Sequence, residues 1–223
     1  MRGLFVTGTD TEVGKTIVAA AVCAALVARG ERVAAFKPVV TGLDEPAGEW
    51  PPDHELLALA TGQAPDDVAR YRFGPPLSPH FAAELAGAAV EPPDLLEHAR
   101  TAGAAADALI CEGVGGLLVP LTPGYLVRDL AVELALPVVV AARPGLGTIN
   151  HTLLTIEAAR AAGLRVAGVA LTPWPDDPAP IERSNRATIE RLSGVPVSGL
   201  PPTDPGSLAR AGRTLPLDDW LAA

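Results

Sequence analysis

The sequence is poor in cysteine and in charged residues, and it has no excess of basic side chains. With two cysteines in 223 residues, it contains neither a disulfide framework nor a Cys/His metal site. Cys23 falls in an apolar helical stretch and Cys111 in an apolar strand-like run, so we expect both to be small buried residues. The net charge of −9, with no basic cluster to offset it, argues against a nucleic-acid partner.

The sequence also lacks the patterns of a signal peptide and of a membrane span. Its first residues read as a strand, without the basic, apolar and cleavage regions of a signal peptide. The longest apolar run, residues 17–28, is too short to cross a bilayer. We therefore expect a protein of a reducing compartment, most simply the cytoplasm, with no membrane partner.

The distribution of apolar residues predicts a single α/β domain over residues 1–223. With 48% hydrophobic and 19% charged residues, the chain has the composition of a globular protein. Strand-like runs alternate with helical stretches, which is typical of a mainly parallel sheet covered by helices on both faces. The predicted strands are residues 4–7, 33–36, 108–111, 137–141, 166–171 and 195–199. The predicted helices are residues 15–29, 53–60, 94–102, 126–135, 149–162 and 179–192.

The most informative stretch joins the first strand to the first helix. Its sequence is Gly8-Thr9-Asp10-Thr11-Glu12-Val13-Gly14-Lys15-Thr16. A glycine-containing turn between a strand and a helix presents backbone N–H groups and the positive end of a helix dipole to an anion. Lys15 adds a cation for the β- and γ-phosphates, and the Thr16 hydroxyl is of the type that holds Mg²⁺. The spacing is one residue longer than in the common P-loop, and the alternative is a tight turn with a surface lysine. We predict a nucleoside triphosphate site.

Polar residues that follow predicted strands are further candidates, because ligands of such sheets lie beyond the carboxyl ends of the strands. Lys37 follows the run at residues 33–36 and could meet a transferring phosphoryl group or an anionic substrate. Thr41 could contact the same ligand. Glu112 follows an apolar strand and begins a glycine-rich segment, which suits a Mg²⁺ ligand beside a phosphate. The plainer alternatives are an exposed lysine and a solvated carboxylate in a turn.

Asp53 and His151 have simpler interpretations. Asp53 precedes a helical stretch, so the local sequence favours a helix N-cap over a metal ligand. His151 has no paired acid or nucleophile nearby in the sequence, and a single histidine of this kind more often packs or caps. No Ser-His-Asp or Cys-His arrangement is evident, so the sequence does not indicate covalent catalysis by a protein nucleophile.

Together, five segments resemble the dethiobiotin synthetase family. They are the phosphate-loop sequence, Phe36-Lys37-Pro38-Val39, Ser78-Pro79-His80, Glu112-Gly113-Val114-Gly115-Gly116 and Leu146-Gly147-Thr148-Ile149-Asn150-His151. The resemblance extends in order over most of the chain and implies a P-loop NTPase-like fold. It also implies the closure of a ureido ring, in which diaminopelargonic acid, CO₂ and ATP give dethiobiotin, ADP and phosphate in biotin biosynthesis.

The resemblance implies a role for each matching residue. The catalytic residues would be Lys37, Lys15 and Thr11, and the Mg²⁺ ligands would be Thr16, Asp53 and Glu112, in place of the N-cap role for Asp53. The nucleotide would contact Glu12, Val13, Gly14, Lys15, Thr16, Ile17, Asp53, Glu112, Thr172, Pro173, Pro201, Pro202 and Thr203. The substrate would contact Thr41, Gly115, Leu146, Thr148 and Asn150. The family is homodimeric with the substrate at the subunit interface, so the segment around Asn150 would reach the partner's site.

Two positions depart from the family pattern. Val114 replaces the more usual alanine of the Glu-Gly-Ala-Gly-Gly segment and adds bulk near the substrate. Thr172 stands where better-known members have an asparagine whose amide recognises adenine, and a threonine cannot offer the same paired donor and acceptor. We expect relaxed base selection, with other nucleoside triphosphates serving appreciably.

Two other functions fit parts of the sequence. One is a P-loop switch such as a partition or septum-positioning ATPase, but these usually carry a second lysine early in the loop. Here the early positions are Thr9, Asp10 and Thr11, and no amphipathic membrane-targeting tail follows. The other is a related amidoligase that acts on a larger carboxylic substrate.

Overall fold

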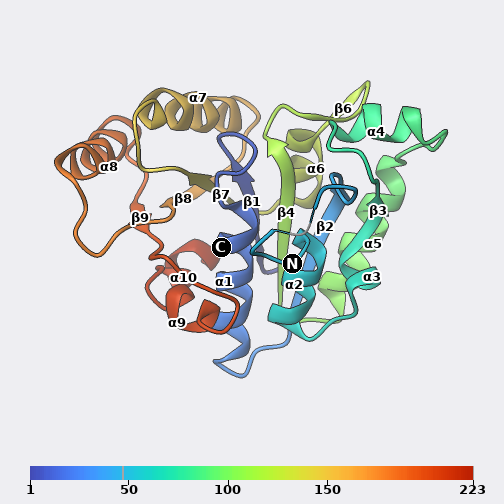
Figure 1. Ribbon diagram of the computed structural model, residues 1–223, viewed down its shortest axis with the longest axis horizontal. Helices are drawn as coiled ribbons and strands as arrows, with labels where there is room; N and C mark the ends of the chain where they lie inside the picture. Colours follow the sequence, from blue (N-terminus) through green and yellow to red (C-terminus); the bar gives the residue numbers. More distant parts are fainter. Residues whose placement is uncertain (47, 223) are drawn as a thin grey trace.

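Seven parallel strands form one sheet in the order β3-β2-β4-β1-β7-β8-β9 in the computed structural model, which describes residues 1–46 and 48–222 (Figure 1). The strands are β1 (Gly3–Gly8), β2 (Val33–Val40), β3 (Ala69–Arg72), β4 (Ala108–Gly116), β7 (Val138–Ala142), β8 (Val166–Leu171) and β9 (Val197–Gly199). A separate antiparallel hairpin pairs β5 (Pro120–Thr122) with β6 (Tyr125–Leu126). The central strand β1 lies between β4 and β7, so the loop after it is flanked by the ends of both.

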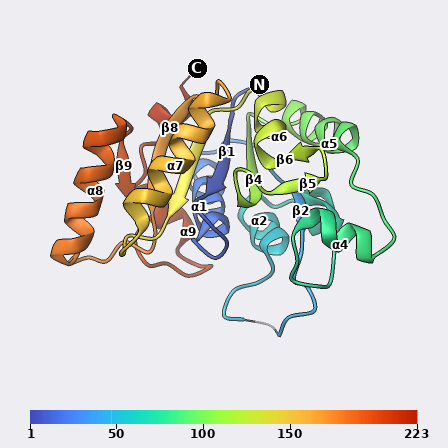
Figure 2. The ribbon, with the colours of Figure 1, turned by 90° about the horizontal axis from the view of Figure 1, so that it is seen from above.

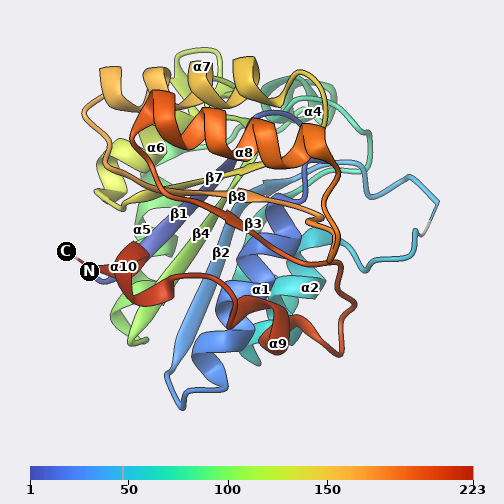
Figure 3. The ribbon, with the colours of Figure 1, turned by 90° about the vertical axis from the view of Figure 1, so that its left-hand side faces the viewer.

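Helices cover both faces of the sheet, as Figures 2 and 3 show. Buried residues of the helices fall into two separate apolar clusters, one on each face. On one face lie α1 (Lys15–Val27), α2 (Asp53–Thr61), α3 (Pro65–Val68), α9 (Leu208–Gly212) and α10 (Leu217–Leu221). On the other lie α4 (Pro79–Leu85), α5 (Pro92–Ala104), α6 (Val127–Leu134), α7 (Thr148–Ala161) and α8 (Pro180–Ser193). Within residues 1–46 and 48–222, every helix is too short or too polar to cross a bilayer.

The continuous apolar strands explain this two-sided arrangement. Leu4 and Val6 of β1 pack into one cluster, and Phe5 between them packs into the other, because successive side chains of a strand point to opposite faces. All three are fully buried, and each burial contributes on the order of 1.5–3 kcal/mol. The predicted α/β class, with a parallel sheet between two layers of helices, is confirmed. Both cysteines are buried free thiols, as expected.

Each predicted strand and helix is present, but two strands extend further than predicted. Strand β2 continues past Phe36 to Val40, and β4 continues past Cys111 to Gly116. Lys37 and Glu112 therefore lie inside strands rather than beyond them, which corrects the prediction. Pairing between β2 and β4 ends at Phe36 and Cys111. Pro38 lies beyond this pairing, so its missing backbone N–H interrupts no hydrogen bond between the two strands. The strands β3, β5 and β6 and the helices α3, α4, α9 and α10 were not predicted.

Candidate active site

The loop between β1 and α1 forms a turn lined by backbone N–H groups. Gly14 caps α1 in a left-handed conformation with φ 84°, which a glycine adopts without strain. Among the described residues, the backbone N–H groups of Val13, Gly14, Lys15 and Thr16 donate to no acceptor. Because they lie at the positive end of the α1 dipole, they are placed to bind an anion, and the phosphate site stays a prediction.

Lys15 folds back onto this loop. Its Nζ donates to the backbone carbonyl of Asp10 at 2.8 Å. Burial lowers the pKa of Lys15 to about 8, and the nearby charge of Lys37 adds to the shift. A phosphate placed in the turn would offer Lys15 a charged acceptor in place of a neutral carbonyl.

Three oxygen-bearing side chains from three elements meet beside the loop. The Thr16 hydroxyl oxygen of α1 lies 2.8 Å from Asp53 Oδ1 of α2 and 2.9 Å from Glu112 Oε1 of β4. A hydroxyl has one hydrogen, so it cannot donate to both carboxylates at once. Glu112 Oε2 is buried and has no hydrogen-bond partner among residues 1–46 and 48–222. The cluster therefore has more acceptors than donors.

Lys37 of β2 supplies the compensating charge. Its Nζ lies 2.5 Å from Asp53 Oδ2 and 2.5 Å from Glu112 Oε1. The lysine side chain is 3% exposed and that of Glu112 is fully buried. The two ion pairs of Lys37 therefore connect β2 to β4 and to α2 beside the phosphate loop.

The pKa shifts in this cluster follow from burial and from the ion pairs. Burial disfavours the charged form of Lys37, but the carboxylates of Asp53 and Glu112 outweigh it and raise the pKa of the lysine. Burial likewise disfavours charged Asp53, yet the adjacent Lys37 lowers the pKa of that carboxyl. For Glu112, burial dominates and raises the pKa, although Lys37 opposes the shift.

The oxygen atoms of this cluster fit a hard divalent cation as ligands. Thr16, Asp53 and Glu112 offer only oxygen atoms, which are the ligands that Mg²⁺ prefers, and the free Glu112 Oε2 is an acceptor that a cation would satisfy. The local prediction that Asp53 is an N-cap is wrong, because α2 begins at Asp53 itself and Pro52 precedes it as the cap residue. The Asp53 carboxylate turns instead to Thr16 and Lys37.

A cavity of about 690 Å³ opens at the carboxyl ends of the strands and gathers many of the predicted residues. Those that line it are Thr11, Glu12, Gly14, Lys15, Thr16, Ile17, Lys37, Thr41, Asp53 and Gly115. Val114 lines it as well, so the bulkier side chain faces the space where a substrate would lie. Trp50 and Glu45 also line it, and no local sequence signal identified them.

The other predicted residues lie around this cavity rather than on its wall. Val13 and Glu112 are buried behind it. Thr172 follows β8, and a Cβ on Gly14 would lie 2.6 Å from its Cγ2, so Thr172 packs against the phosphate loop. Pro173 follows Thr172 directly. The strand next to β8 is β9, and it is followed by Pro201, Pro202 and Thr203.

The segment at the start of α7 is divided between surface and interior. Leu146 is 94% exposed, and Asn150 is exposed on the first turn of the helix. Thr148 is buried, and its hydroxyl oxygen lies 3.3 Å from that of Thr152. None of these three residues lines the cavity formed by this one chain.

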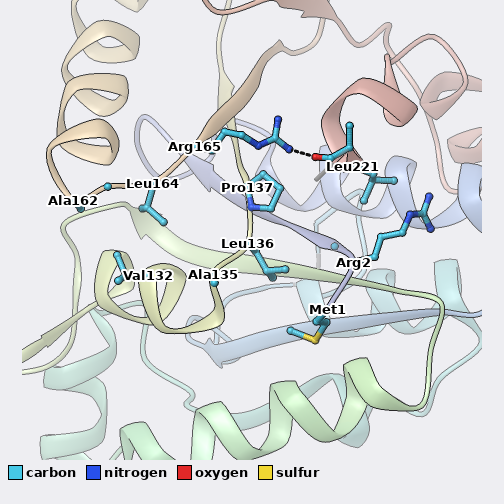
Figure 4. Close-up of a pocket in the computed structure, with 13 residues that line it drawn as sticks. Met1, Arg2, Val132, Ala135, Leu136, Pro137, Ala162, Leu164, Arg165 and Leu221 are labelled. Carbon is cyan, nitrogen blue, oxygen red and sulfur yellow. Dashed lines mark hydrogen bonds between the residues drawn. The ribbon is translucent and has the colours of Figure 1, made fainter.

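A second cavity of about 670 Å³ lies at the opposite end of the sheet, where the strands begin. Figure 4 shows residues that line it. Its lining is mostly apolar, and its two guanidinium groups are engaged. Arg2 pairs with Glu31, and Arg165 donates to the backbone carbonyl of Trp220 at 3.0 Å. The residues that line this cavity include none of the predicted site residues, which gather instead at the cavity beside Lys37.

Comparison with known proteins identifies the family. Residues 2–208 match the family described as AAA domain. The ATP-dependent dethiobiotin synthetase BioD of Anaeromyxobacter dehalogenans is 45% identical over 217 residues, which is 96% of this chain and 96% of that protein. The protein of the same name from Bacillus subtilis (strain 168) is 39% identical over 206 residues, covering 91% of this chain and 87% of that protein. The chain belongs to the dethiobiotin synthetase family. This family consists of ATP-dependent ligases of biotin biosynthesis.

Similar solved structures show the fold alone. A cell division ATPase MinD from Pyrococcus furiosus has a TM-score of 0.54 at 20% identity, covering 97% of this chain and 90% of that one. The apo McdA structure from Cyanthece has a TM-score of 0.55 at 10% identity, covering 95% and 90%. At these identities the likeness shows the α/β fold and carries nothing about a switch function.

Proposed function

We propose that this enzyme carboxylates diaminopelargonic acid and closes its ureido ring with ATP, to give dethiobiotin, ADP and phosphate. The observation that carries the proposal is the position of Lys37, held between Asp53 and Glu112 beside the phosphate loop. A buried ammonium group next to an anion site suits the transfer of a phosphoryl group to a carboxyl-type oxygen.

The reaction begins at the substrate amines. One amine adds to CO₂ and loses a proton, which gives a carbamate. A carbamate oxygen then attacks the γ-phosphorus, ADP leaves, and a carbamic–phosphoric anhydride forms. Lys15 and the backbone N–H groups of the loop bind the phosphates, while Lys37 stabilises negative charge on the transferred group.

Ring closure follows within the same cavity. The second amine attacks the carbonyl carbon and loses a proton, and phosphate leaves with the electrons of the broken C–O bond. This step needs two amines held in order rather than a protein nucleophile, and the cavity walls around Thr41, Val114 and Gly115 provide the positioning. Water would hydrolyse the anhydride, so the chain must also exclude it.

Thr16, Asp53 and Glu112 would hold Mg²⁺ in this proposal. The ion would offset the charge that builds up on the β- and γ-phosphates.

We further propose that the enzyme is a homodimer in which the segment around Asn150 reaches the partner's cavity. Three exposed leucines support an interface on this side, with exposed fractions of 94% for Leu146, 56% for Leu154 and 54% for Leu118. Leu118 and Leu154 line one shallow hollow beside residues 8–10, next to the phosphate loop. Apolar side chains gathered on a surface in this way are typical of contact sites.

Complementation between inactive subunits tests the shared site. Lys37→Ala and Asn150→Ala would each be inactive alone. A mixed dimer would contain one site with both native residues, so equal mixing should restore about one quarter of the wild-type turnover. A mixture as inactive as its components, or a monomer by analytical ultracentrifugation, would contradict the dimer.

Incubation with diaminopelargonic acid, bicarbonate, Mg²⁺ and ATP, followed by mass spectrometry for the cyclic urea, tests the reaction itself. Lys37→Ala should abolish the product while leaving nucleotide binding largely intact. Arg29→Ala, which removes an exposed cation paired with Asp218, is the matched control and should retain turnover. Formation of no cyclic urea by the wild-type enzyme would refute the proposal.

A further inference from the structure

The side chain of Arg143 reaches from the end of β7 to the phosphate loop. Its Nε and one terminal nitrogen donate to the backbone carbonyl of Glu12, at 3.2 and 2.9 Å. Arg143 directly follows β7, which pairs with β1 up to Gly8 and Ala141, so the two loops leave the sheet side by side. We propose that Arg143 is a positioning residue that sets the shape of the phosphate loop for ATP.

The planarity of the peptide bond gives this contact its effect. In a trans peptide the carbonyl and the following N–H point in opposite directions. Because Arg143 holds the Glu12 carbonyl on its own side, the N–H of Val13 is directed to the other side of the peptide plane. That N–H donates to no acceptor among the described residues. It therefore stays available to a phosphate oxygen.

The backbone at Glu12 needs such a restraint. Its φ is 54°, in the left-handed region, and it is one of two non-glycine residues with positive φ in the described part of the chain. A residue with a Cβ holds this conformation only where its surroundings enforce it. The Glu12 carboxylate contributes little, because it is 90% exposed and lies 3.9 Å from Arg143. The two hydrogen bonds to the carbonyl are the stronger restraint.

Arg143 can act as a fixed support because its own loop is anchored from a third element. Asn185 of α8 donates to the carbonyls of Pro144 and Gly145, at 2.9 and 3.0 Å. These hydrogen bonds come from α8 and do not involve the Arg143 side chain. Removing the guanidinium should thus loosen the phosphate loop and leave the segment from Gly145 to Asn150 in place.

Steady-state kinetics of Arg143→Ala provides the test, and the inference rests on the proposed ATP site. We expect the KM for ATP and the calorimetric Kd for ATP to rise roughly tenfold. The kcat and the KM for diaminopelargonic acid should stay within about twofold, because neither Lys37 nor the α7 segment loses a contact. Arg143→Lys, which keeps the charge but not the two-pronged geometry, should restore only part of the affinity.

The matched control is Arg183→Ala. Arg183 is also a half-exposed arginine that donates to a backbone carbonyl, that of Pro178, but it lies on α8 away from the phosphate loop. Arg183→Ala changes the net charge by the same amount as Arg143→Ala and should leave the KM for ATP unchanged. An equal rise in both variants would mean a general charge effect and would overturn the inference.

Salt distinguishes positioning from direct contact with phosphate. A carbonyl is a neutral acceptor, so the ratio of variant to wild-type KM should be the same at about 0.05 M and about 0.5 M salt. A ratio that collapses towards one at high salt would show a charge acting on the phosphates and would overturn the inference. An unchanged KM for ATP in Arg143→Ala would overturn it too, whereas failure of the wild-type enzyme to bind ATP would refute the proposed function instead.

Discussion

The ammonium group of Lys37 and the carboxylate of Glu112 lie 2.5 Å apart, and both side chains are buried. Each side chain makes the burial of the other tolerable, because an isolated charge in the interior is strongly unfavourable. The pair also holds the strands β2 and β4 in register at the point where their ladder ends. One lysine thus serves the fold and, in our proposal, the phosphoryl transfer.

Lys37→Met should make the fold dependent on a divalent cation. It removes the cation that contacts both Glu112 and Asp53 and leaves only the more distant charge of Lys15, and removing one partner of a buried ion pair costs about 3–5 kcal/mol. Mg²⁺ bound between the carboxylates would replace the lost charge. We expect thermal unfolding to show a larger Mg²⁺-induced rise in Tm for Lys37→Met than for the wild type. Equal shifts in the two proteins would contradict a metal site at these carboxylates.

Thr172 should leave the enzyme with weak base selection. The residue lies against Gly14, where its hydroxyl cannot offer the paired donor and acceptor of an asparagine amide. We expect turnover with CTP and GTP at an appreciable fraction of that with ATP. Thr172→Asn should sharpen the preference for ATP. A strong preference for ATP in the wild type would defeat the idea.

Loss of Asn185 should destabilise the loop that joins β7 to α7. Asn185→Ala removes the donor from two carbonyls, and we expect a loss of about 1–3 kcal/mol in the free energy of unfolding, measured with urea. The nearly isosteric Asn185→Asp should cost no less, because a carboxylate cannot donate and would face two carbonyl oxygens. An Asp variant as stable as the wild type at neutral pH would show that the donor contributes nothing.

Asp94 should make stability depend on pH in the acid range. Hydrogen bonds from Arg70, and then from Tyr71, lower the pKa of Asp94 below its ordinary value of 3.8. The folded state therefore binds this proton more weakly than the unfolded state. The stabilisation is complete above the unfolded pKa and is lost as the pH falls through the folded pKa. The difference in unfolding free energy between wild type and Asp94→Asn should be constant near neutrality and should shrink below about pH 4.

Asp176→Asn is the control for the loss of one carboxylate. Asp176 is exposed, and its carboxylate has no hydrogen bond or ion pair within residues 1–46 and 48–222. Its substitution removes the same formal charge without removing a hydrogen bond. A difference for Asp94→Asn that persists undiminished at pH 2 would show that its effect is not electrostatic.

The sequence predicted those parts of the fold that local signals determine. The phosphate loop is contiguous, and the central strands of the parallel sheet each contain a short apolar run. Strand β3 was missed because its four residues include Arg70 and Arg72, which suit an exposed edge and do not read as apolar. The ends of β2 and β4 were placed too early because charged residues, Lys37 and Glu112, ordinarily mark the end of a buried strand.

Contacts between distant residues could not be predicted in this way. The local sequence around Asp53 is that of a helix start, and only the fold brings Thr16 and Lys37 to its carboxylate. Arg143 and Glu12 are 131 positions apart, so no spacing rule connects them. Both the metal-type cluster and the restraint on the loop are products of the order of strands in the sheet.

The two outermost strands restrict how copies of the chain can associate. Strand β3 has four residues, two of them arginines, and β9 has three residues and follows Pro196. Short edge strands that carry charged or proline residues disfavour the addition of a strand from another chain. Self-assembly by extending the sheet from one molecule into the next is therefore disfavoured. In our proposal the copies pair instead through the leucine-bearing side of α7, where Leu154 lines the hollow beside residues 8–10.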